Sequence, residues 1–122
     1  MDTPEYHSPM TDRLNKLYEI ADGYRATFDD GDSPFVILAR LTEELGEIAT
    51  AVNHLERKGA KVDKHGEPDP SALAEELEDL LHNTLALARH YGVEGALDAA
   101  IDATHARVAP RRPRSTDMDR TQ

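Results

Sequence analysis

The chain has 122 residues, with 24 acidic and 14 basic side chains and a formal net charge of −10 at pH 7. This length fits one domain with a modest core, and the absence of cysteine excludes a disulfide framework, a thiolate metal site and a cysteine nucleophile, as is usual for a cytoplasmic protein. We expect no membrane partner, because no apolar run approaches the roughly 20 residues of a membrane span, and no long nucleic acid, because binding one needs clustered basic residues.

The charge is divided between an acidic body and a short basic tail. Residues 110–122 contain four Arg, two Asp, two prolines and one apolar residue, so we expect a disordered polar tail. Residues 1–109 then hold ten basic and 22 acidic residues and are expected to form the domain. Four arginines beside two aspartates are a weak signal for nucleic acid, and a solubilising tail is the simpler interpretation.

Four segments have helical periodicity, and none has sustained strand alternation. The segments span about 9–24, 34–58, 71–91 and 93–107. Pro34 follows a capping serine at the start of the second segment, and Gly59 and Gly92 are expected to end the second and third. The pattern predicts an all-α fold, with a four-helix bundle-like protomer in which a loop of about 12 residues lets the two long helices lie antiparallel.

Each segment has an apolar stripe that we expect to face its neighbours. In the first helix the stripe consists of Leu14, Leu17, Tyr18, Ala21 and Tyr24. In the second it consists of Leu38, Leu41, Leu45, Ile48, Val52 and Leu55. In the third it consists of Leu73, Leu77, Leu80, Thr84, Leu87 and Tyr91. In the fourth the inward residues are Ala96, Leu97, Ala100 and Ile101.

A short internal repeat places acidic residues on the two long helices. Residues 41–48 (LTEELGEI) recur as residues 73–80 (LAEELEDL) with a constant offset of 32. The repeat pairs Glu44 with Glu76 and Glu47 with Asp79, and each helix carries its two acids at i and i+3, on one face. Each acid immediately precedes a stripe residue, about 100° of helix rotation away, at the flank of the expected interface.

Antiparallel packing of these helices would bring four carboxylates together. One like-charge contact at about 4 Å costs about 4 kcal/mol at an effective dielectric of about 20. A divalent cation removes this cost, and an all-oxygen ligand set selects Mg²⁺, or Mn²⁺ as a substitute. One ExxE pair alone is better interpreted as a solvated helix face, but two pairs in register favour a metal site.

The acidic motif resembles a known signature. EExxE at residues 43–47, followed after 28 residues by ExxD at residues 76–79, is similar to the EExxE…ExxD pattern of the all-α nucleotide pyrophosphohydrolases. This superfamily includes MazG-like proteins, dimeric dUTPases, dCTP pyrophosphatases and phosphoribosyl-ATP pyrophosphohydrolases. The resemblance covers residues from about 14 to 107.

The resemblance implies a Mg²⁺-dependent enzyme that hydrolyses a nucleoside triphosphate to the monophosphate and pyrophosphate. A role in nucleotide-pool sanitation follows, with dUTP, dCTP or a modified nucleotide as the substrate. The family's metal ligands correspond to Glu44, Glu47, Glu76 and Asp79. Glu43 matches the first Glu of the motif, which is a further ligand or orients the attacking water. A carboxylate accepts the proton of that water, and Glu47 and Glu43 are the candidates.

Substrate contacts are less specified by the sequence. Asn83 lies one turn after Asp79, where it is either a ligand of ribose or base or a polar residue in a wet interior. Tyr24, like Phe28 and Phe35, is either a stacking partner for a base or part of the core. In several relatives a K…NR-like stretch of the last helix helps to hold the phosphates. This chain keeps only Arg107 of that stretch, so Arg107 is a candidate phosphate contact. The other candidate cations are Arg40, Lys58, Lys61 and Lys64.

Two other functions remain open, and an oligomer is expected. A non-catalytic helical interaction module would carry the same acids as a surface. A di-iron bundle would use acid-x-x-His pairs from two helices, whereas here Asp79 precedes His82 but Glu47 precedes Thr50. The apolar faces exceed what one partner helix covers, so we expect a homodimer or homotetramer with the active site near a subunit interface.

Overall fold

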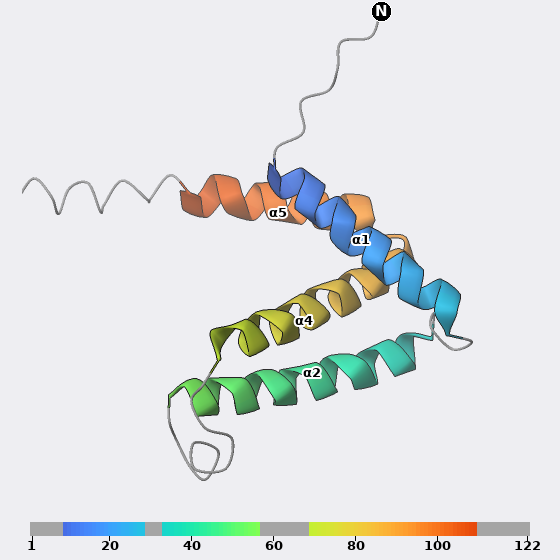
Figure 1. Cartoon of the computed structure of the whole chain (residues 1–122). Helices are drawn as coiled ribbons and strands as arrows, with labels where there is room; N and C mark the ends of the chain where they lie inside the picture. The colour runs from blue at the N-terminus through green and yellow to red at the C-terminus, as the bar shows by residue number, and fades with distance from the viewer. Residues whose placement is uncertain (1–8, 29–32, 57–68, 110–122) are drawn as a thin grey trace, which may run out of the picture. The chain divides into compact units, whose positions relative to one another are not determined.

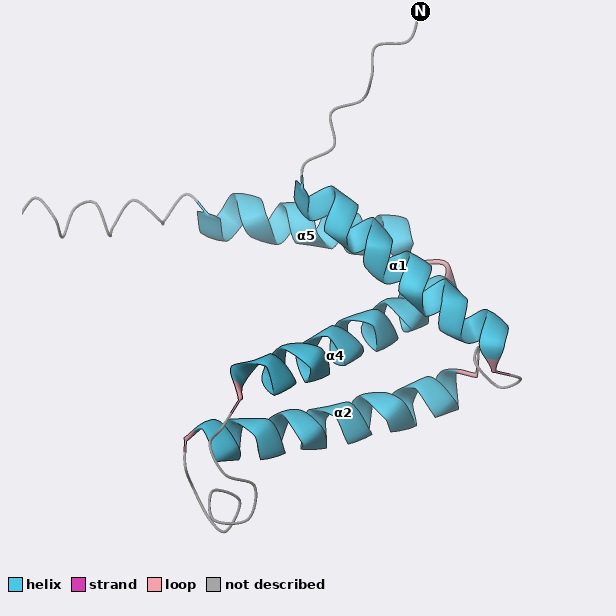
Figure 2. Cartoon of the chain, viewed as in Figure 1, coloured by secondary structure: helices cyan, strands magenta, loops and turns pink. Residues whose placement is uncertain are grey.

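The computed structural model describes residues 9–28, 33–56 and 69–109, with the backbone alone for 9–11. It contains the helices α1 (Pro9–Thr27), α2 (Pro34–Leu55), α4 (Pro70–Tyr91) and α5 (Glu94–Val108) (Figure 1). The described residues include no strand (Figure 2), so the prediction of an all-α fold is confirmed. Among these helices, none has the length and apolarity needed to cross a membrane.

Local signals set the helix ends as expected at two places. Ser33 adopts an extended conformation (φ −71°, ψ 123°) immediately before Pro34, which occupies the first helical turn of α2. The Ser33 side chain forms no capping hydrogen bond, so the helix begins as predicted but without the expected side-chain cap. α4 ends at Tyr91, where Gly92 has a φ of 65°, the left-handed conformation that glycine adopts without steric cost.

Two other ends differ from the prediction. α1 continues to Thr27, past the expected end at Tyr24, and the Thr27 hydroxyl donates to the Gly23 carbonyl at 2.8 Å. α2 ends at Leu55 rather than near residue 58, and the predicted stop at 59 lies outside the described residues.

The described residues up to Tyr91 form one compact unit, and those from Gly92 to Ala109 form a second. In the first unit, α2 and α4 lie side by side and antiparallel, as predicted, and α1 packs across the C-terminal half of α4 (Figure 1). In the second unit, α5 has no buried residue. Ala96, Ala100 and Ile101, which were expected to point inward, are exposed. The tail predicted at 110–122 lies outside the described residues.

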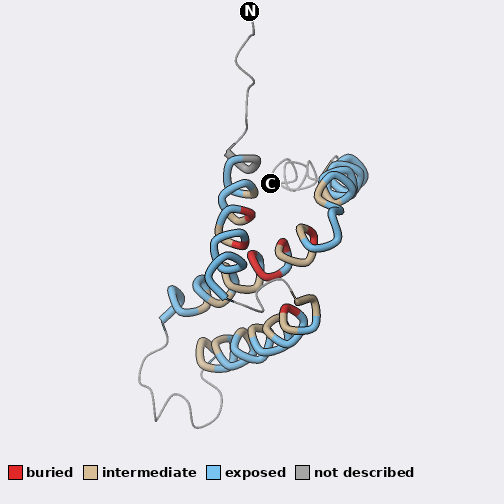
Figure 3. The backbone as a smooth tube through the Cα atoms, turned by 90° about the vertical axis from the view of Figure 1, so that its right-hand side faces the viewer, coloured by how far each residue is buried: buried red, intermediate tan, exposed pale blue. Residues whose placement is uncertain are grey.

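The core of the first unit lies where α1 crosses α4. Its buried apolar residues are Tyr18, Ala21, Ile37, Leu85 and Ala88 (Figure 3). Arg89 of α4 donates to both carboxylate oxygens of Asp22 of α1, each at 3.1 Å, and its guanidinium lies 4.5 Å from the centre of the Tyr18 ring. The α1–α4 contact therefore joins apolar burial to a bidentate ion pair.

The predicted apolar stripe of α2 is wrong in half of its positions. Leu38, Leu45 and Val52 are 51%, 61% and 42% exposed. The less exposed residues form a face about one position away around the helix. They are Ile37, Leu41, Glu44, Ile48, Ala51 and Leu55.

α4 differs from its predicted stripe in the same way. Leu77, Thr84 and Tyr91 of that stripe are exposed, whereas His82 and Asn83 are buried together with Leu85 and Ala88. Both helices are rotated so that Glu44, Glu76 and Asp79 are half-buried, while Glu47 stays exposed. Periodicity locates an apolar row but does not determine which neighbour covers it, and this choice leaves one apolar row of α2 exposed.

Candidate functional site

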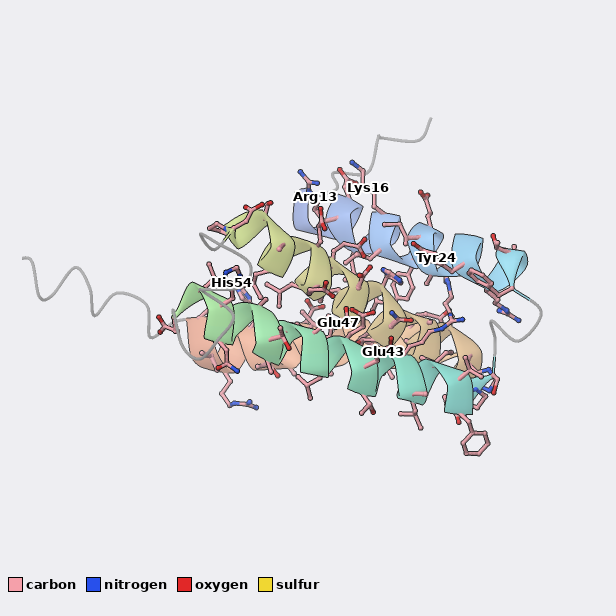
Figure 4. All side chains as sticks on the ribbon, turned by 60° about the horizontal axis from the view of Figure 1, so that its bottom comes forward. Arg13, Lys16, Tyr24, Glu43, Glu47 and His54 are labelled. Atoms are coloured by element: carbon pink, nitrogen blue, oxygen red, sulfur yellow. The ribbon has the colours of Figure 1, made fainter. Side chains whose placement is uncertain are left out.

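Three of the four predicted acids meet between α2 and α4. Glu44, Glu47 and Glu76 each place a carboxylate oxygen within 4.8 Å of the others. Glu44 and Glu76 are half-buried, and Glu47, which projects from the middle of α2 (Figure 4), is exposed. The arrangement follows from the repeat, because i, i+3 spacing puts two acids on one helix face and antiparallel packing sets the two faces opposite each other. We call these three residues the carboxylate cluster.

Asp79 lies beside the cluster, one turn after Glu76 on α4. It is half-buried, and its charge acts on all three members of the cluster. The structure thus keeps the four predicted acids in one electrostatic group.

Burial and the contacts among the acids raise the pKa of each carboxyl in the cluster. The pKa of Glu47 rises because Glu76 forms a hydrogen bond and lies close as a like charge. Burial is the largest cause of the raised pKa of Glu44, and repulsion from Asp79 and Glu47 adds to it. The hydrogen bond from Glu47 lowers the pKa of Glu76, but burial and repulsion outweigh it, and the net shift is upward. The group therefore resists carrying its full negative charge by itself.

Two oxygens of the cluster lack partners. Glu44 Oε2 and Glu76 Oε2 are buried and have no hydrogen-bond partner among the described residues. An unsatisfied buried polar atom costs about 1–3 kcal/mol, so such atoms need an explanation. Oxygen ligands with excess negative charge suit a hard divalent cation, and this donor set fits Mg²⁺ or Mn²⁺.

A pocket of about 330 Å³ adjoins the cluster. Its lining residues are Tyr24, Phe28, Arg40, Glu44, Asp79, His82 and Asn83. Tyr24 and Asn83, two of the predicted substrate contacts, are thus brought together beside the acids. Asn83 is buried, and its side-chain nitrogen donates to the Asp79 carbonyl at 2.8 Å, which orients the amide next to a predicted metal ligand.

Aromatic rings stack along one wall of this pocket. The Tyr24 ring lies 4.9 Å from the His82 ring at 16° and 6.2 Å from the Phe28 ring at 9°. The guanidinium of Arg40 lies 5.4 Å from the centre of the Phe28 ring. His82 is buried, and its Nδ1 contacts the Glu78 carboxylate. Glu78 was not among the predicted site residues, although an acid and a His at i and i+4 have the spacing that indicates such a pair.

The other predicted residues lie apart from this pocket. Glu43 is exposed on α2 and is not part of the carboxylate cluster, although its charge acts on Glu44. Phe35 is 80% exposed. Lys58, with the lysines at 61 and 64, lies outside the described residues, and Arg107 is exposed on α5 in the second unit.

A second group of possible metal ligands, which combines two acids with a histidine, lies entirely on α4. Glu78, Asp79 and His82 also place ligand atoms within 4.8 Å of one another. The di-iron alternative needs such pairs on two helices. The corresponding position on α2 is Thr50, whose hydroxyl donates to the Gly46 carbonyl at 3.2 Å.

Comparisons with known proteins place the chain in a family. The model of the MazG nucleotide pyrophosphohydrolase domain matches residues 33–114, which include all four acids and Asn83. The chain is 40% identical over 101 residues to the uncharacterized protein YpjD of Bacillus subtilis (strain 168), over 81% of this chain and 83% of that protein. No solved structure matches. The chain therefore belongs to the MazG nucleotide pyrophosphohydrolase family.

Proposed function

We propose that this protein is a divalent-metal-dependent nucleoside triphosphate pyrophosphohydrolase. It cleaves the bond between the α- and β-phosphates and releases a nucleoside monophosphate and pyrophosphate. The observation that carries the proposal is the convergence of Glu44, Glu47 and Glu76, with two buried oxygens that lack partners, next to an aromatic-walled pocket. Family membership supports the reaction class.

In this proposal the acids divide two tasks. Glu44, Glu47, Glu76 and Asp79 hold Mg²⁺, for which Mn²⁺ is a substitute. The bound metal supplies neutralisation of phosphate charge and a lowered pKa of water. Glu47 also accepts the proton of the attacking water, a role supported by its exposure beside the proposed metal ligands. Glu43 is the alternative base, and it stands outside the carboxylate cluster.

The pocket next to the acids receives the nucleoside. Tyr24 offers a ring for base stacking, and Asn83 offers a buried amide for the ribose or base. The protein then acts in nucleotide-pool sanitation in the cytoplasm, on dUTP, dCTP or a modified nucleotide.

Product analysis with a panel of canonical and modified nucleotides and Mg²⁺ tests the reaction. Monophosphate plus pyrophosphate is the expected product pair, and diphosphate plus phosphate would overturn the cleavage site. Glu76→Gln should abolish pyrophosphate release without loss of helical circular dichroism. The matched control is Glu75→Gln, which changes an exposed neighbour outside the carboxylate cluster and should remain active. A fully active Glu76→Gln variant would refute the metal assignment.

We also propose that the active protein is a homodimer or a homotetramer. Leu38, Leu45 and Val52 form an exposed row with seven-residue spacing on α2, and Leu77 and Leu81 are exposed on α4. A second copy is the partner that best matches this row, because like helices with a seven-residue apolar repeat pack together. Light scattering should show a dimer or tetramer for the wild type and a smaller species for Leu45→Glu. A monomeric wild type would contradict this proposal.

A further inference from the structure

We infer that Arg40 binds a phosphate group of the substrate and that Phe28 positions it. This inference rests on the proposed function and adds a residue to its site. A cation is expected in this site because a cluster of carboxylates repels a triphosphate. A fixed positive charge beside the cluster offsets that repulsion.

Arg40 is placed on the same side of α2 as the acids. It precedes Glu44 by four residues and Glu47 by seven, a spacing that puts all three on one helix face. Arg40 is half-buried and lines the same pocket as Glu44 and Asp79. Of the residues that line this pocket, it is the one with a permanent positive charge.

The guanidinium of Arg40 keeps its donors available. In the described part of the chain it forms no salt bridge, and its contact is with the face of the Phe28 ring. Arg89 provides the contrast within the same unit, because it donates two hydrogen bonds to Asp22 and joins α1 to α4. A guanidinium with a free fork of N–H groups matches a phosphate through two parallel hydrogen bonds.

Phe28 is itself held in place through a chain of contacts. Its backbone N–H donates to the Tyr24 carbonyl at 3.2 Å, its ring stacks with Tyr24, and the Tyr24 ring stacks on buried His82. Phe28 is thus held, through Tyr24 and His82, against α4, the helix that also carries Glu76 and Asp79. Tyr24 and Phe28 precede residues 33–114, which match the family model, so these two ring contacts lie outside the matched region.

Arg40→Gln is the direct test, and Arg13→Gln, which removes an exposed arginine of α1 far along the sequence from the pocket, is the matched control. With Mg²⁺ present, Arg40→Gln should raise KM for the preferred triphosphate by about tenfold or more, as expected for a lost charge-assisted hydrogen bond. Arg40→Lys should recover part of this loss, since it restores the charge but not the planar fork. Arg13→Gln should behave as the wild type.

Product inhibition identifies the phosphate. Weaker inhibition of Arg40→Gln by pyrophosphate assigns Arg40 to the leaving group, and weaker inhibition by the nucleoside monophosphate assigns it to the α-phosphate. Either result supports the inference. Unchanged KM and unchanged inhibition by both products would overturn it.

Phe28→Leu tests the positioning role, because it keeps the charge of Arg40 and removes the ring. It should raise KM less than Arg40→Gln, and the double variant should be no worse than Arg40→Gln alone. Independent, additive effects would show that Phe28 does not act through Arg40.

Calorimetric binding of Mg²⁺–pyrophosphate separates this inference from the proposed function. If the wild type releases no pyrophosphate from any triphosphate, the proposed function fails. Tighter binding of Mg²⁺–pyrophosphate by the wild type than by Arg40→Gln would still support Arg40 as a phosphate ligand. Equal binding of Mg²⁺–pyrophosphate and of the nucleoside monophosphate by the two proteins, or binding of neither by the wild type, would overturn the inference as well.

Discussion

The α1 crossing and the middle of the α2–α4 pair serve opposite purposes. At the α1 crossing, Tyr18 and Ala21 of α1 and Leu85 and Ala88 of α4 are buried, and an ion pair joins the two helices. In the middle of the pair, the interface instead contains the carboxylate cluster with raised pKa values and oxygens that lack partners. The α1 crossing stabilises the unit by burying apolar side chains. This stabilisation permits the middle of the α2–α4 pair to hold a carboxylate cluster that is unfavourable without a ligand.

The largest loss of stability is expected from a substitution at the α1 crossing, where the buried side chains are apolar. Leu85→Ala, which truncates a side chain that is 5% exposed, should lower the free energy of unfolding by about 2–5 kcal/mol. Urea denaturation followed by circular dichroism measures this change. Leu45→Ala is the contrast, because that side chain is 61% exposed. Its effect should depend on protein concentration if it acts through a second copy, whereas that of Leu85→Ala should be present at every concentration. A small effect of Leu85→Ala would place the stabilising core elsewhere.

Metal binding should change stability through the acidic middle. Mg²⁺ at about 100 times its Kd should stabilise the wild type by about 2.7 kcal/mol, and a chelator should remove this gain. Thermal denaturation with and without Mg²⁺ measures the shift in Tm. Glu76→Gln should lose most of the shift and Glu75→Gln should keep it. An equal shift in both variants would indicate that the ion binds outside the carboxylate cluster.

The smallest effect is expected from pH in the metal-free protein. The pKa values of Glu44 and Glu76 are raised above the ordinary value of 4.5 in the folded state, so folding favours their protonated forms. Below about pH 4.5 both are protonated whether folded or unfolded, and their contribution to stability is fully present. This contribution to stability is lost as the pH rises through the raised pKa values of Glu44 and Glu76.

The Glu44→Gln/Glu76→Gln double variant should therefore be more stable than the wild type at neutral pH in chelator. The difference should shrink as the pH falls toward 4.5. Urea titrations at several pH values measure it. A wild type that is the more stable protein at neutral pH without metal would show that the cluster is satisfied by the protein alone.

Much of the site was predictable because its spacing is local. Glu44 and Glu47 share a face of α2 in any α-helix, as Glu76 and Asp79 do on α4, and the loop between the helices permits antiparallel packing. The cluster found in the structure follows from those facts. Local spacing could not predict the stack of His82, Tyr24 and Phe28, because the stack joins α1 to α4 across more than 50 residues of sequence.

The sequence by itself determined that the chain is helical, where most helices begin or end, and which acids share a face. These properties depend on caps, prolines, glycines and the 3.6-residue repeat, which act within a few residues. The tertiary structure decided the rotation of α2 and α4, which turned Glu44 inward and left Leu45 exposed, and it placed Arg40 beside Phe28. A helix takes its rotation from the sum of its contacts with all neighbours, and that sum is not local to any segment.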